Sequence, residues 1–278
     1  MGHRPFSPFA RPSFRALLLG GWFFASSIVA CHSDESEPTA ATHQSDRTGA
    51  VIDSVSTVEP AIPAEFGDFL KSNEKLYSQF NEELIVRHFF KDRRDGVFLD
   101  VGCAYPIRLS TTYFLEKHLD WSGIAIDAFD YYRKAWTKER KRSNFLNYAV
   151  GDQDGETITF HVAGEPSLSS VNEEQAEKWG GPESVALKVE TITLTKALED
   201  HADAPLDFLS IDIEGAELAA LSGFDIDRFR PKLVCIEAHT NGGANEEGIR
   251  SYFGEHGYVL LEAYLPYDRA NWYFAPRD

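Results

Sequence analysis

The stretch Phe208–Leu218 constrains the fold more than any other part of the sequence. Its first half is apolar and predicts a buried strand, whereas Gly215 and the helix-forming residues after it predict a helix. Two carboxylates, Asp212 and Glu214, stand where the strand should end. A strand that leads directly into a helix is half of a βαβ unit, and such sheets bind ligands at the carboxyl ends of their strands. The acids are therefore candidates for a ligand site, although carboxylates at a helix N-terminus also stabilise the helix alone.

The rest of the chain alternates between predicted strands and predicted helices. Short apolar runs bounded by glycine or polar residues predict strands, and amphipathic runs predict helices. Their order indicates one α/β sheet of about seven strands, mostly parallel, with helices on both faces. The predicted strands are 97–101, 123–127, 144–150, 157–162, 186–194, 208–213, 231–237, 258–263 and 271–275, and the predicted helices are 68–90 (with a loop or cap near Ser78), 110–119, 132–142, 196–200, 216–221 and 246–256.

Composition excludes several classes of protein. The 278 residues suffice for one large domain and an appendage. The net charge of −17 argues against nucleic acid as the main partner, because phosphates would be repelled. The three cysteines, Cys31, Cys103 and Cys235, have neither metal-site nor disulfide spacing, and no HExxH, GxSxG or Walker-type motif is present.

The N-terminal residues 1–31 have the composition of a signal, anchor or targeting segment. Three arginines precede an apolar run over 16–30, which is short for a membrane span and suited to a secretory signal. The run ends in Ile28–Cys31, which resembles the lipobox of bacterial lipoproteins and implies lipid attachment to Cys31. An uncleaved anchor and an organellar transit peptide are the alternatives.

The composition then divides the chain further. Residues 32–63 are rich in Ser, Thr, Asp, Glu, Ala and Pro and hold no aromatic residue, which predicts a disordered tether. Residues 64–278 form the predicted folded domain. This organisation predicts a membrane-associated, lipid-anchored and exported protein, with a cytoplasmic or organellar location if the segment is a misassigned start or a transit peptide.

The first predicted strand, 97–101, runs into Gly102 and then into a helix. This strand, glycine turn and helix are typical of the opening of a nucleotide-binding sheet. The next strand ends at Asp127, where an acid commonly holds ribose hydroxyls, although the same residue also suits a helix N-cap. The helix over 132–142 is rich in Arg and Lys, and a solvated face is favoured there over an anion site.

Four segments resemble, in the same order, the motifs of FkbM-type methyltransferases, which are class I enzymes that use S-adenosylmethionine. The most specific segment contains Asp212 and Glu217. Two further segments, 189–194 and 231–237, also fit, and the resemblance extends over about residues 65–276. The four segments are Ser78–Gln79 with the acids after it, Phe98–Gly102, Asn147–Asp152 and Ser210–Glu217.

The resemblance implies a Rossmann-like class I methyltransferase fold with S-adenosyl-L-methionine as the cofactor. It implies methylation of a hydroxyl group on a small-molecule acceptor, such as a sugar or a hydroxylated metabolite. The turn after the first strand would hold the methionine part of the cofactor, Asp127 the ribose, and the third strand end the adenine. The cofactor-binding residues that it implies are Gln79, Asp100, Gly102, Cys103, Tyr105, Asp127, Asn147, Val150 and Asp212.

Methyl transfer to a hydroxyl group needs a base. Asp212 and His239 are the candidates, with Glu214 as a third catalytic residue, and histidine titrates near neutrality. His239 also fits a hydrogen-bonded loop residue. We expect a metal-free site, with a divalent cation held by Glu214, Glu217 and Glu237 as the alternative.

The sequence departs from the class I pattern in the first turn. Ala104 and Pro106 stand where many such enzymes have Asn and a second Gly, and Pro106 has no backbone N–H. Tyr105 and Arg108 are expected to compensate. This departure supports a rival hypothesis, in which the domain is a non-catalytic, membrane-tethered binding module. The predicted export signal supports it too, because S-adenosylmethionine is made in the cytosol. A nicotinamide oxidoreductase fits less well, because its three-glycine motif is missing.

Overall fold

The computed structural model describes residues 66–180, 185–202, 204–238 and 245–277. The predicted signal segment 1–31, the predicted tether 32–63 and the candidate base His239 lie outside these residues. No helix among the described residues is long and apolar enough to cross a membrane.

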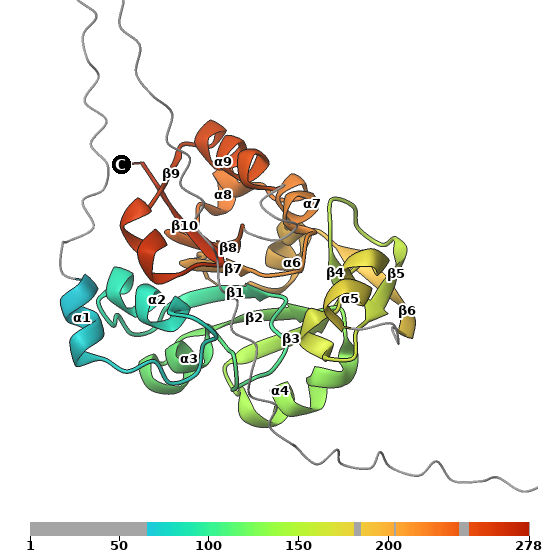
Figure 1. The fold of residues 1–278 in the computed structure, drawn as a ribbon, viewed down its shortest axis with the longest axis horizontal. Coiled ribbons are helices and arrows are strands. Elements are labelled where there is room, and N and C mark those ends of the chain that lie inside the picture. Colours follow the sequence, from blue (N-terminus) through green and yellow to red (C-terminus); the bar gives the residue numbers. More distant parts are fainter. Residues whose placement is uncertain (1–65, 181–184, 203, 239–244, 278) are drawn as a thin grey trace, which may run out of the picture. The chain divides into compact units, whose positions relative to one another are not determined.

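The body is built on a seven-stranded sheet in the order β3-β2-β1-β7-β8-β10-β9 (Figure 1). Strands β3, β2, β1, β7 and β8 pair in parallel, while β10 runs antiparallel to both β8 and β9. The predicted sheet of about seven mostly parallel strands is thus confirmed. The strands are β1 (Val97–Val101), β2 (Ser122–Asp127), β3 (Ser143–Asn147), β7 (Phe208–Ile211), β8 (Leu233–Glu237), β9 (Tyr258–Leu260) and β10 (Asn271–Pro276).

A second, three-stranded sheet has the order β4-β6-β5. It consists of β4 (Ala149–Val150), β5 (Thr157–Val162) and β6 (Val185–Ile192). The prediction of one strand over 144–150 was therefore wrong. The last pair between β2 and β3 joins Asp127 to Asn147, so β3 has no partner beyond that point, and Ala149 pairs with Thr191 of β6 instead.

Helices cover both faces of the main sheet (Figure 1). Alternation along β1 sends Leu99 into a core with α6, α7, α8 and α9, and Phe98 into a core with α2 and α3. Trp136 of α4 packs on Ala125 of β2. The helices are α1 (Phe66–Ser72), α2 (Glu82–Phe90), α3 (Tyr113–Leu119), α4 (Arg133–Glu139), α5 (Glu173–Gly180), α6 (Leu194–His201), α7 (Glu217–Ser222), α8 (Ile226–Phe229) and α9 (Glu246–Glu255), with 3₁₀ turns η1 (Asp130–Tyr132), η2 (Pro166–Leu168) and η4 (Glu262–Tyr267).

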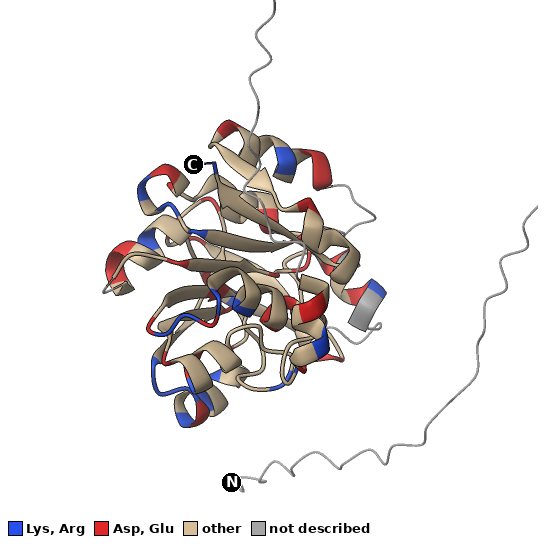
Figure 2. Cartoon of the chain, turned by 90° about the vertical axis from the view of Figure 1, so that its left-hand side faces the viewer, with Lys and Arg blue, Asp and Glu red and all other residues tan. Residues whose placement is uncertain are grey.

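The charged residues occupy the helices and loops, whereas the strands at the centre are mostly uncharged (Figure 2). This distribution fits parallel strands that are buried on both faces. The helical periodicity over 68–90 proved to be two helices, α1 and α2, because residues 73–81 form a turn between them. That turn contains Ser78, where a loop or cap was expected.

Gly123 allows β1 and β2 to approach each other closely. A Cβ atom at this position would lie 2.2 Å from the Phe98 carbonyl oxygen and 2.6 Å from its ring. Gly254 in α9 is a matched contrast, because a Cβ atom there would meet nothing within 4 Å.

We predict opposite effects for these two glycines. Gly123→Ala should destabilise the protein by about 2 kcal/mol or more, because the central strand pair must separate. Gly254→Ala should be neutral or stabilise by up to about 1 kcal/mol through helix propensity. Denaturant unfolding followed by circular dichroism measures both, and equal stability of the two variants would contradict the close approach at Gly123.

Candidate active site

The carboxyl ends of β1 and β7 meet at the centre of the sheet. The backbone N–H of Asp212 donates to the Val101 carbonyl at 3.0 Å. Gly102 has a φ of 79°, and a Cβ atom there would lie 1.7 Å from the Asp212 carbonyl oxygen. Only glycine tolerates both the left-handed backbone and the contact. The predicted glycine turn and the predicted acidic corner are therefore one site.

A largely apolar cleft opens beside this contact and encloses about 550 Å³, counting space open to solvent. Of the predicted site residues, Gly102, Asp127, Val150, Asp212 and Glu214 line it. The remaining lining residues are Val101, Ala104, Ile126, Ala128, Ala149, Phe160, Pro166, Ser167, Ser169, Val171, Ile213 and Ala216.

A second, acidic cavity of about 850 Å³ by the same measure adjoins the apolar cleft. The two share Gly102, Ala104, Ser167, Asp212 and Glu214. Asp212 therefore stands where one space meets the other. The acidic cavity is also lined by Gln79, Phe80, Cys103, Tyr105, Arg108, Leu109, Glu165, Leu168, Glu237 and Ala270.

Asp127 is fixed at the end of β2 by backbone donors. The N–H groups of Ala104 and Phe129 donate to its two carboxylate oxygens at 2.9 and 2.8 Å. Burial raises the pKa of Asp127 to about 6, against the opposing effect of these donors. Asn147 lines neither cavity, because its side-chain amide donates to the carbonyls of Asp127 and Ala128. Its position at the strand end thus shapes the loop after β2.

Asp100 also lies away from both cavities. It points to the opposite face of β1, where Thr112 donates to its carboxylate at 2.6 Å. Burial raises its pKa, while Thr112 and Arg140 oppose the shift. Cys103 is buried at the wall of the acidic cavity, and burial raises the pKa of its thiol well above the usual value. This thiol is therefore protonated at neutral pH.

Arg140 holds the unusual first turn. Its side chain is fully buried and pairs with Glu116 at 2.6 Å. It also donates to the Pro106 carbonyl at 3.1 Å and to the hydroxyls of Ser110 and Thr112. Pro106 thus takes part in the turn through its carbonyl, which accepts a hydrogen bond, although it has no N–H to donate. Burial sets Arg140 apart from its basic neighbours, and the expected solvated helical face does not include it.

The turn reaches its shape without a second glycine. Ala104 and Leu109 both have left-handed backbones, with φ of 39° and 60°. Ala104 is held from both sides, because its N–H donates to Asp127 and its carbonyl accepts from Trp136 of α4 at 2.8 Å. Side-chain hydrogen bonds thus impose a conformation that glycine would adopt freely.

Asp212, Glu214 and Glu237 gather at the acidic cavity, with one carboxylate oxygen from each within 4.8 Å of the others. Asp212 is exposed to solvent at the cavity, although protein atoms surround its carboxylate closely enough to desolvate it. This desolvation, together with the charges of Glu237 and Glu214, raises its pKa well above the usual value. The oxygen cluster has the chemistry of a divalent-cation site, and the metal-free site stays a prediction.

Glu217 does not belong to this cluster. It is fully buried, and its carboxylate accepts from the N–H groups of Ile213 and Gly215 and from the amide of Asn245. Burial raises its pKa to about 7. Glu217 thus holds the turn that carries Asp212 and Glu214, and its carboxylate is not one of the three that gather at the acidic cavity.

The loop after β5 forms a wall that both cavities share. The Tyr105 hydroxyl donates to Glu165 at 2.9 Å, and the Arg108 guanidinium lies 3.7 Å from the same oxygen and 4.1 Å from the Tyr105 ring. Tyr105 and Arg108 thus both contact Glu165, and their expected compensation in cofactor binding stays a prediction. Sequence patterns missed Ser167, Ser169 and Phe160, because only the second sheet brings them to the cleft.

We predict that Arg140→Met destabilises the protein by about 3–5 kcal/mol, because Glu116 loses its buried counter-charge. Adding Glu116→Gln should recover part of this loss. Lys138→Met, at an exposed position of α4 two residues before Arg140, should be neutral. Denaturant unfolding of the wild type, these three variants and Glu116→Gln alone measures these effects, and strictly additive losses in the double variant would argue against the pairing.

No curated protein matches the chain. Among solved structures, precorrin-6y C5,15-methyltransferase from Geobacter metallireducens is 11% identical, with 73% of this chain and 89% of that chain covered and a TM-score of 0.41. A TehB-like SAM-dependent methyltransferase from Corynebacterium glutamicum is 10% identical, with 77% and 95% covered and a TM-score of 0.39.

A TDP-rhamnose 3'-O-methyltransferase of calicheamicin biosynthesis is 14% identical, with 77% of this chain and 93% of that chain covered and a TM-score of 0.40. The family model of the FkbM methyltransferase domain matches residues 100–260, which include the glycine turn, Asp127 and the acidic corner. The chain therefore belongs to the FkbM methyltransferase family and is an S-adenosylmethionine-dependent methyltransferase.

Proposed function

We propose that this protein transfers a methyl group from S-adenosyl-L-methionine to a hydroxyl group of an uncharged small molecule such as a sugar. The observation that carries the proposal is the place of Asp212, which lines both the apolar cleft and the acidic cavity. A group at that boundary reaches the cofactor from one side and the acceptor from the other.

The residues of the apolar cleft fit the cofactor. Asp127 presents a buried carboxylate at the end of β2, where ribose hydroxyls can donate to it. Ala149, Val150 and Phe160 offer an apolar surface for the adenine ring. Gly102, at the turn after β1, also lines the cleft. When bound, the cofactor supplies the electrophilic methyl group.

Asp212 is the proposed general base. Its raised pKa brings a carboxylate closer to neutrality, where a base is most effective in accepting a hydroxyl proton. Glu214, on the same loop, lines both cavities and adds to the negative potential there. His239 lies outside the described residues, directly after β8 and Ala238, and its role as a second base stays a proposal.

The acidic cavity favours an uncharged acceptor. Among the residues that the structure describes, four carboxylates line it, from Asp212, Glu214, Glu237 and Glu165, against the single guanidinium of Arg108, which pairs with Glu165. A phosphate or carboxylate on the acceptor would be repelled in such a space. Hydroxyl groups can instead donate hydrogen bonds to these oxygens.

The first test combines binding with activity on the full-length protein. Calorimetry should show binding of S-adenosylhomocysteine, and tritium from the methyl-labelled cofactor should appear in neutral methyl glycosides. Asp212→Asn should reduce the transfer rate by about 10²–10⁴-fold and leave the Kd for S-adenosylhomocysteine within a few-fold.

Asp152→Asn is the matched control, because Asp152 is exposed and lines neither cavity; it should transfer at the normal rate. A chelator is expected to leave the rate of methyl transfer unchanged. If the chelator abolished transfer and magnesium restored it, a metal would instead be assigned to the acidic cluster. A folded protein without cofactor binding would overturn the proposal in favour of a non-catalytic module.

We also predict a pH dependence of cofactor binding. Asp127, with a pKa of about 6, must ionise to accept both ribose hydroxyls, so the Kd for S-adenosylhomocysteine should rise about tenfold between pH 7 and pH 5. The raised pKa also makes the unliganded protein lose stability as the pH rises from about 4 to 6. Stability and cofactor binding thus change in opposite directions with pH, so binding must be measured directly. Asp127→Asn should bind weakly at every pH, and a profile like that of the wild type would contradict the assignment.

A further inference from the structure

The turn between α1 and α2 forms one wall of the acidic cavity. Gln79 and Phe80 line the cavity together with Asp212 and Glu237. Neither Gln79 nor Phe80 lines the apolar cleft, where the cofactor is placed. Gln79 is exposed and Phe80 is half-buried, so both side chains are available to a ligand.

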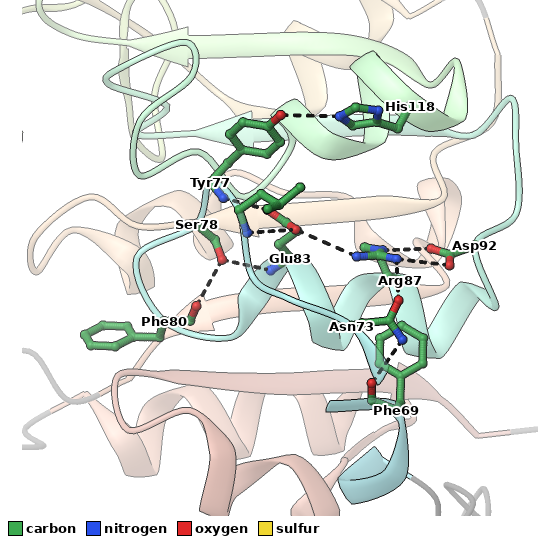
Figure 3. Close-up of polar contacts among 10 residues, drawn as sticks. Phe69, Asn73, Tyr77, Ser78, Phe80, Glu83, Arg87, Asp92 and His118 are labelled. Carbon is green, nitrogen blue, oxygen red and sulfur yellow. Dashed lines mark hydrogen bonds and ion pairs between the residues drawn. The ribbon is translucent and has the colours of Figure 1, made fainter. Parts of the chain in front are cut away.

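Two carboxylates at the start of α2 shape this turn. Glu83 is fully buried and accepts from the N–H groups of Leu76 and Tyr77 at 3.3 and 2.9 Å (Figure 3). The neighbouring Glu82 accepts from the N–H of Phe80. The backbone of the turn is thus bound to the helix that follows it.

Ser78 adds a second connection within the turn. Its hydroxyl donates to the Phe80 carbonyl at 3.0 Å and accepts from the N–H of Glu83 at 3.2 Å (Figure 3). Arg87, one helical turn after Glu83, lies 3.9 Å from the Glu83 carboxylate and is itself fixed by Asp92 and Asn73. The buried carboxylate of Glu83 therefore has both backbone donors and a counter-charge.

The turn is also fastened to the far end of the chain. Asn81 donates to the Tyr267 carbonyl at 2.7 Å, and the Asn271 amide lies 3.4 Å from Glu82. Arg269 stacks over the Phe80 ring at 5.2 Å. The loop from η4 to β10, which contributes Ala270 to the cavity, thus meets the turn and completes the same wall.

We propose that Gln79 and Phe80 bind the acceptor, and that Glu83 is the positioning residue that holds them at the acidic cavity. The proposal rests on the proposed function. The ring of Phe80 offers an apolar surface for the carbon face of a polyhydroxylated ring, and the Gln79 amide both donates to and accepts from hydroxyl groups. Gln79 then serves the acceptor rather than the cofactor.

Steady-state kinetics with neutral methyl glycosides tests the assignment in the full-length protein. Phe80→Ala and Gln79→Ala should raise the KM for the glycoside by about tenfold or more, while the Kd for S-adenosylhomocysteine changes less than about twofold. Leu76→Ala is the control, because Leu76 lies in the same segment with an exposed side chain and does not line the cavity. It should leave both constants unchanged.

Glu83→Ala should raise the same KM, with Glu83→Gln intermediate, because one amide oxygen can keep only one of the two backbone donors. If Glu83→Ala unfolds in a thermal melt, the Phe80→Ala and Gln79→Ala variants still test the acceptor assignment. A rise in the Kd for S-adenosylhomocysteine equal to the rise in KM would overturn this inference and leave the methyltransferase proposal standing. A wild-type protein that binds S-adenosylhomocysteine but methylates no glycoside would overturn the sugar acceptor and this inference together.

Discussion

The backbone of Gly102 lies against the carbonyl of Asp212, closer than any side chain would permit. This contact exists because β1 and β7 are adjacent parallel strands at the centre of the sheet. Strands β1 to β3 extend the sheet in one direction from this point, and β7 to β10 extend it in the other. The contact brings the turn after the first strand to the acidic corner after β7. Gly102 and Asp212 line both the apolar cleft and the acidic cavity.

Buried ionisable side chains hold the loops around this contact. Arg140 orders the first turn through Pro106 and Thr112, and Glu217 orders the turn that carries Asp212 and Glu214. In each case one buried side chain accepts or donates several hydrogen bonds. Such groups stabilise one loop conformation strongly, because any alternative leaves a buried polar group without partners.

The same arrangement explains how the first turn departs from the pattern of many class I methyltransferases. Ala104 takes up a left-handed backbone because Asp127 and Trp136 bind its N–H and its carbonyl. Pro106 is compatible with the turn because its carbonyl, and not an N–H, meets Arg140. The departure therefore alters the means by which the turn is held and leaves the cleft beside it open.

The sequence by itself determined the α/β class, the mostly parallel sheet, and the placement of Gly102, Asp127 and Asp212 at strand ends. Apolar runs that alternate with amphipathic ones are local patterns, and the carboxyl ends of parallel strands lie at a common edge. The family match to residues 100–260 confirmed the family, and the Ser78–Gln79 segment lies outside the matched residues. Local periodicity could not show that β3 ends at Asn147, since that end depends on where its partner β2 ends.

Only the tertiary structure decided which polar residues face the site. Asp100 stands two residues before Gly102 yet points to Thr112 on the opposite face of β1. Arg140 directly follows the basic helix α4, yet its side chain is buried and pairs with Glu116. Gln79 and Phe80 reach the acidic cavity across a gap of more than a hundred residues in sequence from Asp212. A side chain's direction and its distant partners depend on the packing of whole elements against each other, which no local pattern of residue types contains.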